Sequence, residues 1–107
     1  MRKTLILLLI TNLFVMTSCT WVHLTPQGEN IRTVNESETA GCKKLGETTV
    51  SVLAKIAGIK RNREKIRTEL RTLGRNSAAE MGGDTIVPVS EIKNGEQTFA
   101  VYECINP

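Results

Sequence analysis

The first 18 residues most restrict what this chain can fold into, because they have the layout of an export signal and not of a folded element. Arg2 and Lys3 form a positive start, an apolar stretch with two polar interruptions continues to Met16, and two small residues precede Cys19. This order is typical of a secretory signal. The apolar stretch is too short for a permanent membrane span, which needs about 20 apolar residues. We therefore predict a signal peptide over 1–18.

The residues Met16-Thr17-Ser18-Cys19 resemble the bacterial lipobox, with methionine in the place where leucine is usual. The resemblance implies a diacylglyceryl group on the Cys19 sulfur, cleavage before Cys19 and acylation of the new N-terminus, with palmitate as a typical chain. Several acyl chains hold a protein stably at a bilayer, so the expected anchor does not span it. The alternative is an ordinary cleaved signal, which would leave Cys19 as an unpaired thiol in an oxidising compartment.

Loss of the signal leaves 89 of the 107 residues, enough for one small domain with limited capacity to bury a core. The 14 basic residues become 12 against 11 acidic ones when Arg2 and Lys3 are removed, so the formal charge falls from +3 to +1. The basic balance of the whole chain belongs mostly to the signal. We therefore expect no nucleic-acid partner.

Cys42 and Cys104 remain as a pair in the exported domain. An oxidising compartment favours a disulfide between them. Closing a loop of this length would stabilise so small a fold by about 4 kcal/mol on the chain-entropy model. The alternative is a metal site with two cysteine ligands, but such a site needs further ligands, and the single histidine, His23, lies close to the anchor. We expect no metal and no cofactor.

Periodicity predicts one helix, over about 62–81, with Asn62 as its N-cap and Gly82-Gly83 at its end. Its predicted apolar face consists of Ile59, Ile66, Leu70, Leu73, Ser77 and Met81. Gly74 within it is consistent with close packing on a sheet. Segment 54–60 is apolar but contains Gly58, and we predict a loop or an irregular strand end there.

Segments rich in β-branched residues predict strands at 30–34, 42–53, 85–89 and 97–104, and Asn94-Gly95 predicts a hairpin turn before the last of them. The polar segment 35–41 is expected to be a loop. The order β-β-α-β-β predicts an α+β domain with one helix packed on a small, largely antiparallel sheet and one disulfide. We expect 19–28 to be the lipidated N-terminus with a short tether and 29–107 to be a single periplasmic domain.

Four segments together resemble a family of small proteobacterial lipoproteins described only as a domain of unknown function. They are Trp21–Pro26, Cys42–Glu47, Arg75–Val87 and Phe99–Cys104. The resemblance covers nearly the whole exported chain and implies a location and a fold, but no activity. A remoter resemblance, in Leu45-Gly46-Glu47 and the end of the helix, is to the Rcs envelope-stress sensor lipoprotein. That sensor has two disulfides and this chain can form one, so its signalling role does not transfer.

The reactive residue types in the sequence do not favour an enzyme. A catalytic triad or a Cys-His site needs a positioned histidine, and His23 lies on the expected tether. Glu80 and Asp84 could be read as a carboxylate pair, but an exposed helix residue and a turn residue is the simpler interpretation. The short Gly82-Gly83-Asp84-Thr85 segment follows the C-terminus of a helix, where the helix dipole repels anions. We expect no catalytic residues.

Arg67, Arg71 and Arg75 recur every four residues and are expected to form one ridge on the helix. Lys60 and Arg61 are expected near the same side. Such a ridge could contact lipid headgroups, lipopolysaccharide phosphates or an acidic partner, or it could be an ordinary solvated helix face with Glu64 nearby. Trp21 fits the bilayer interface and a packed position equally well.

Taken together, the residues predict a lipid-anchored binding domain. Known sorting rules retain lipoproteins in the inner membrane mainly when Asp follows the lipidated cysteine, and Thr20 stands there, which implies the periplasmic face of the outer membrane. The first hypothesis is an interaction module with an envelope protein partner. The second is a structural protein that contacts lipid or lipopolysaccharide through the arginine ridge.

Overall fold

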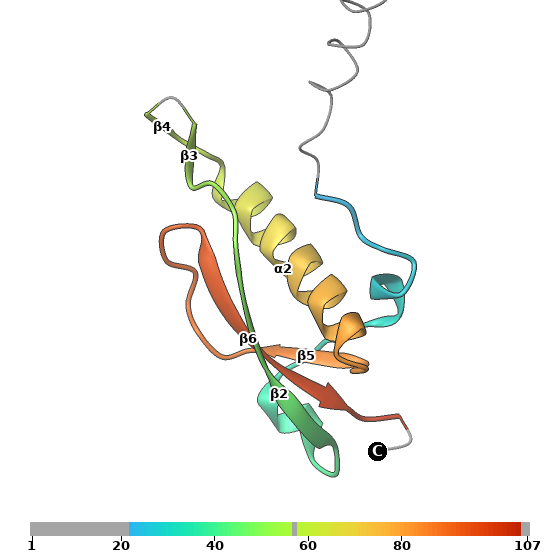
Figure 1. Ribbon diagram of the computed structural model, residues 1–107. Coiled ribbons are helices and arrows are strands. Elements are labelled where there is room, and N and C mark those ends of the chain that lie inside the picture. The colour runs from blue at the N-terminus through green and yellow to red at the C-terminus, as the bar shows by residue number, and fades with distance from the viewer. Residues whose placement is uncertain (1–21, 57, 106–107) are drawn as a thin grey trace, which may run out of the picture.

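The computed structural model describes residues 22–56 and 58–105, so the expected signal, Cys19, Thr20 and Trp21 lie outside the described residues. Within these residues, two short 3-10 helices, one long helix and six strands follow one another (Figure 1). They are η1 Gly28–Asn30, β1 Arg32–Thr33, η2 Glu36–Thr39, β2 Lys43–Ser51, β3 Lys55–Ile56, β4 Ile59–Lys60, α2 Arg63–Glu80, β5 Thr85–Pro88 and β6 Glu96–Glu103.

The main sheet has four strands in the order β1-β5-β6-β2. The pairs β5–β6 and β6–β2 are antiparallel, whereas the short β1 pairs in parallel with β5. The helix α2 packs on this sheet and contacts β2, β5 and β6. The α+β class, the order β-β-α-β-β of the main sheet and the single packed helix are therefore confirmed, with a sheet that is mixed at one edge.

Both ends of α2 lie where the sequence placed them. The Asn62 side chain accepts hydrogen bonds from the backbone N–H groups of Glu64, at 2.8 Å, and Lys65, at 3.4 Å. At the other end Gly82 has a φ of +81°, and its N–H donates to the carbonyl of Ala79, while that of Gly83 donates to Ala78. Such an ending needs a left-handed residue, for which glycine carries no steric penalty.

The buried residues of α2 recur every four positions, as Ile66, Leu70, Gly74 and Ala78. The predicted apolar face was wrong at its two ends, because the side chain of Ile59 is 73% exposed and that of Met81 is 37% exposed. Ile59 belongs to a separate hairpin, and Met81 lies beyond the last helical turn. Helical periodicity therefore does not determine the burial of either residue.

Gly74 marks the closest approach of α2 to the sheet. A Cβ atom on Gly74 would lie 2.8 Å from Cδ2 of Phe99, whose side chain is only 2% exposed. The buried cluster beneath the helix includes Phe99, Val101, Ile86 and Ala78. The predicted close packing at Gly74 is confirmed.

Segment 54–60 forms a small hairpin instead of a simple loop. Strands β3 and β4 pair with Lys55 opposite Lys60, and the N–H of Arg61 donates to the Ala54 carbonyl at 3.0 Å. Gly58 in the turn has a φ of +79°. A run this short has no clear periodicity, so the sequence pattern could not distinguish a hairpin from a loop.

Two loop predictions had different outcomes. Asn94 and Gly95 have φ values of 52° and 72°, and Lys93 and Glu96 exchange backbone hydrogen bonds of 3.0 Å across them, which confirms the predicted turn. Segment 35–41, predicted to be a loop, contains the 3-10 helix η2. The Asn35 N–H donates to a Glu38 carboxylate oxygen at 2.8 Å and stabilises its start.

Cys42 and Cys104 form the predicted disulfide, with their Cα atoms 4.4 Å apart and a sequence separation of 62. They flank the last register pair of β2 and β6, in which Lys43 lies opposite Glu103. The disulfide therefore fastens the end of the sheet that lies far from the β3–β4 hairpin.

The described part of the expected tether is docked on α2. The Asn76 side chain accepts from the N–H of Thr25 at 2.9 Å and donates to the carbonyl of His23 at 2.7 Å. Gly28 is buried against the same asparagine, where an added Cβ atom would overlap the Asn76 Oδ1 atom. Asn76 thus fixes where the N-terminal segment joins the domain.

Candidate functional site

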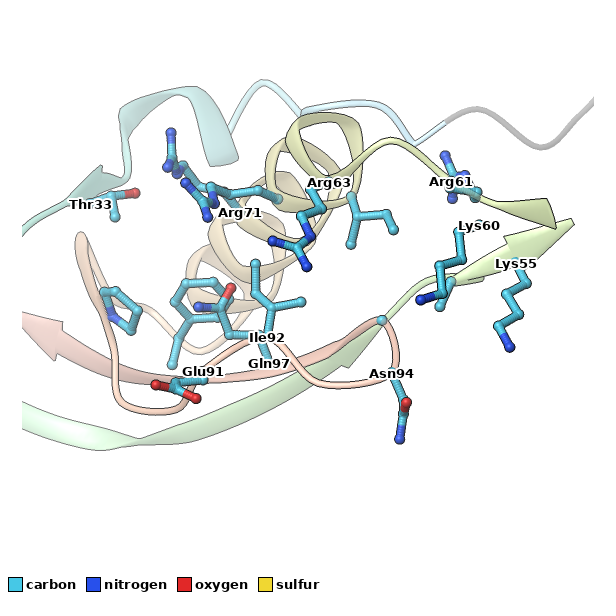
Figure 2. Close-up of a pocket in the computed structure, with 16 residues that line it drawn as sticks. Thr33, Lys55, Lys60, Arg61, Arg63, Arg71, Glu91, Ile92, Asn94 and Gln97 are labelled. Carbon is cyan, nitrogen blue, oxygen red and sulfur yellow. The ribbon is translucent and has the colours of Figure 1, made fainter.

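A groove of about 740 Å³ opens between the first half of α2, the β3–β4 hairpin and the segment that joins β5 to β6 (Figure 2). Its lining combines six basic side chains with one carboxylate, that of Glu91. The basic residues are Lys55, Lys60, Arg61, Arg63, Arg67 and Arg71. Since residues 19–107 carry a formal charge of only +1, this concentration of positive charge is local to the groove.

Two elements supply the cations from opposite walls. On α2, Arg63, Arg67 and Arg71 lie four residues apart and therefore project along one side of the helix. On the hairpin, Lys55 and Lys60 are directly opposite each other in register and share one face. Figure 2 shows Arg63 pointing from the helix toward Ile92, Arg71 farther along the helix on the side of Thr33, and Lys55 and Lys60 extending from the hairpin.

Arg61 has a structural role at the junction of the two walls. Its Nη2 atom donates to Glu69 Oε1 at 2.7 Å, its Nη1 atom donates to the carbonyl of Leu53 at 3.0 Å, and the Arg61 and Glu69 side chains are only 15% and 19% exposed. The hydrogen bond from Arg61 lowers the pKa of the Glu69 carboxyl, against the opposing effect of burial. This pair fastens the end of the hairpin to α2.

The base of the groove is apolar. Phe99 and Ile66 line it and are 2% and 8% exposed, and the half-buried Ile92 contributes from the opposite wall. A site with an apolar base and a cationic rim suits a ligand that carries both negative charge and apolar surface.

The predicted arginine ridge is divided between two environments. Arg67 and Arg71 line the groove, and Arg67 Nη1 lies 3.7 Å from Glu64 Oε1, so Glu64 partly balances the charge as expected. Arg75 does not line the groove. Its guanidinium donates to the carbonyls of Ile31 and Glu29, both at 2.9 Å, and holds η1 against the helix. The row that faces the groove begins instead one turn earlier, at Arg63.

Glu80 and Asp84 have separate surroundings. Glu80 is exposed at the end of α2. The Asp84 carboxylate accepts hydrogen bonds of 2.8 Å from the N–H groups of Cys104 and Ile105 and from the Thr85 hydroxyl. Burial raises the pKa of Asp84, but these three hydrogen bonds and the charge of Arg32 outweigh it and lower that pKa. Both carboxylate oxygens of Asp84 therefore accept hydrogen bonds that stabilise the fold.

Sequence reasoning missed Lys55 and Arg63 as members of the groove. Lys60 and Arg61 were expected near the arginine ridge and do line the groove, but the hairpin that turns Lys60 toward α2 was not predicted. A row at 63, 67 and 71 has the same spacing as the predicted one at 67, 71 and 75, so spacing alone could not separate them.

Within 22–56 and 58–105, no group of three His, Cys, Asp or Glu side chains could hold a metal ion. His23 contributes its backbone carbonyl to Asn76, as described above. A search of the helices in these same residues finds none that is long and apolar enough to cross a membrane.

Comparison with known proteins gives one match. No curated protein and no solved structure matches the chain. A family model matches residues 22–104, which include every strand of the sheet, α2 and both disulfide cysteines. The chain therefore belongs to the family described as Domain of unknown function (DUF4156).

Proposed function

We propose that this chain is a lipid-anchored domain of the bacterial cell envelope that acts by binding a negatively charged partner. The anchor is the acylated Cys19, and Thr20 directs the protein to the periplasmic face of the outer membrane. The resemblance of Met16–Cys19 to the lipobox, and of the exported chain to small proteobacterial lipoproteins, supports this location.

The observation that carries the binding proposal is the charge of the groove. Among the described residues, Lys55, Lys60, Arg63 and Arg71 line it without a hydrogen-bonded or ion-paired carboxylate. Concentrated charge of one sign in a concave site attracts ligands of the opposite sign. An interaction module with an acidic or phosphorylated partner accounts for this arrangement.

A second candidate is a structural protein that contacts lipid or lipopolysaccharide through arginines. Arg67 and Arg71 are placed for such contact because they line the groove. Arg75 adds little to it, since its guanidinium is already bonded to two backbone carbonyls.

Photo-crosslinking in intact cells tests the binding proposal. In one variant a photoreactive residue replaces Glu91, which lines the groove. In the control variant it replaces Glu80, which is exposed at the far end of α2. We expect adducts from position 91 and none from position 80. A protein adduct favours the interaction module, and an adduct with lipid alone favours the structural candidate. Equal adducts at both positions, or none at either, would contradict a binding groove.

Fractionation tests the location separately. We expect the wild type at outer-membrane density in a sucrose gradient, and Thr20→Asp at inner-membrane density. Wild-type protein in the inner-membrane fraction would refute the proposed sorting.

A further inference from the structure

The groove contains basic side chains that form no ion pair with the described carboxylates of the domain. Arg61 forms an ion pair with Glu69, and Arg67 lies near Glu64. The other four basic side chains have no carboxylate partner among the described residues; they are Lys55, Lys60, Arg63 and Arg71. All four side chains are exposed at the groove. Basic residues on both walls can therefore contact one ligand from two sides.

Two of these placements destabilise the empty fold. Lys55 and Lys60 are cross-strand partners, and like charges directly opposite each other in a hairpin repel. Arg63 is the first residue of α2, where the helix dipole disfavours a cation and favours an anion. An anion between the walls would relieve both conflicts.

The volume of the groove and its apolar base restrict the class of ligand further. About 740 Å³ is within the range of sites for small organic ligands. Phe99, Ile66 and Ile92 give it an apolar base, which suits carbon-bearing ligands better than a hydrated inorganic ion. Arginine and lysine side chains are the usual partners of phosphate oxygens.

The anchor determines which phosphates lie within reach. Cys19 precedes the first described residue by three positions, an extended reach of no more than about 10 Å. The described N-terminal segment joins the domain at Asn76, which is 13 positions along α2 from Arg63, roughly 20 Å from the hairpin end of the groove. A domain held this closely meets the headgroups of its own membrane at high effective concentration.

We infer that the groove binds the phosphate groups of anionic lipid headgroups in the membrane that anchors the chain. This inference rests on the proposed function, because the lipid anchor is what brings membrane lipids close to the groove. It names the partner that the same groove binds. Lys55 and Lys60 contact phosphate groups at the hairpin end of the groove, Arg63 and Arg71 contact them along α2, and the apolar base receives the carbon skeleton next to them.

The test uses the whole mature chain from residue 19, with Cys19→Ser, exported behind an ordinarily cleaved signal. Its binding is measured by co-sedimentation with vesicles of equal parts phosphatidylglycerol and phosphatidylcholine, and with vesicles of pure phosphatidylcholine. The groove variants are Lys55→Gln/Lys60→Gln and Arg63→Gln/Arg71→Gln. The control is Lys43→Gln/Lys44→Gln, which removes the same charge from the opposite end of β2.

We expect the wild type to bind the anionic vesicles and not the neutral ones. Each basic residue near an anionic surface contributes on the order of 1 kcal/mol, so each groove variant, which lacks two of them, should bind roughly 30-fold more weakly, and the control nearly as well as the wild type. Neither groove variant should unfold at a lower temperature than the wild type, because each removes an unfavourable charge placement. Glu91→Gln should strengthen binding.

Three results would overturn the assignment. The first is no binding of the wild type, and the second is equal loss in the control and groove variants, which would indicate net charge alone. The third is binding of soluble glycerol 3-phosphate that is as tight as vesicle binding when the two are compared per phosphate group at one ionic strength, which would indicate a soluble phosphate ligand. The tested chain carries no lipid, so none of these results depends on whether Cys19 is acylated. If the vesicle test fails but position 91 gives a protein adduct in cells, the groove binds a protein partner and the lipid assignment alone is wrong.

Discussion

The carboxylate of Asp84 accepts a hydrogen bond of 2.8 Å from the backbone N–H of Cys104, 20 positions along the sequence. Asp84 lies between α2 and β5, and Cys104 follows β6 and carries the disulfide to Cys42. One side chain and one covalent bond therefore fix the end of β6 from two directions. Neither contact involves the groove, so this end of the domain can be perturbed without altering the proposed binding surface.

Replacing Asp84 by alanine should destabilise the fold by about 1–2 kcal/mol, because two backbone N–H groups lose a charged acceptor. The folded state lowers the pKa of Asp84, so its contribution is complete above the ordinary Asp pKa near 4 and disappears as the pH falls through the lowered pKa. Urea unfolding of both proteins should show a difference that is constant near neutral pH and shrinks on acidification. A difference that grows toward low pH would contradict the assigned hydrogen bonds.

Reduction of the Cys42–Cys104 disulfide should lower the free energy of unfolding by about 4 kcal/mol, since the bond closes a loop that spans 62 positions. Thermal unfolding with and without reductant measures the effect on the mature chain with Cys19→Ser. The oxidised chain should contain no free thiol. Two thiols that titrate in the native, air-oxidised protein would be incompatible with this bond.

Gly74→Ala should destabilise the domain even though alanine favours helices. The new Cβ atom would lie 2.8 Å from the buried Phe99 ring, and such overpacking costs about 1–3 kcal/mol, more than the helix propensity of roughly 1 kcal/mol recovers. Phe99→Leu in the same chain should recover part of the loss, as a double-mutant cycle would show. Stabilisation by Gly74→Ala alone would mean that α2 does not approach β6 this closely.

Asn76→Ala should release the N-terminal segment from α2, because it removes the acceptor for the Thr25 N–H and the donor to the His23 carbonyl. Hydrogen exchange of the Thr25 amide should accelerate at least tenfold, while amides in the centre of β6 keep their protection. Asn76→Asp retains the acceptor and should protect the Thr25 amide in part. Unchanged exchange in Asn76→Ala would contradict the docking.

The local signals of the sequence predicted the elements well where each signal has one structural meaning. Asn62 could cap a helix, Gly82 could end it, and Asn94-Gly95 could make a two-residue turn, and each does so. Paired cysteines in a chain that was expected to be exported predicted the disulfide for a similar reason. These features depend on neighbours within a few residues, or on the chemical compartment.

The features that were not predicted depend on contacts between distant segments. Arg75 has the spacing of a surface arginine, yet it bonds to carbonyls 44 and 46 positions away. Asp84 looked like a turn residue, and its partners follow β6. The groove requires the β3–β4 hairpin to turn Lys55 and Lys60 toward α2, and no periodicity in so short a segment indicates that.

The mass of the intact mature protein, extracted from membranes with detergent, tests the central claim most directly. A lipid-anchored domain predicts a chain that begins at Cys19 and carries the added mass of a diacylglyceryl group and an N-acyl chain, and a Cys19→Ala variant that carries neither and does not fractionate with membranes. A wild-type chain that begins at another residue, or that begins at Cys19 with no added mass, would contradict the account.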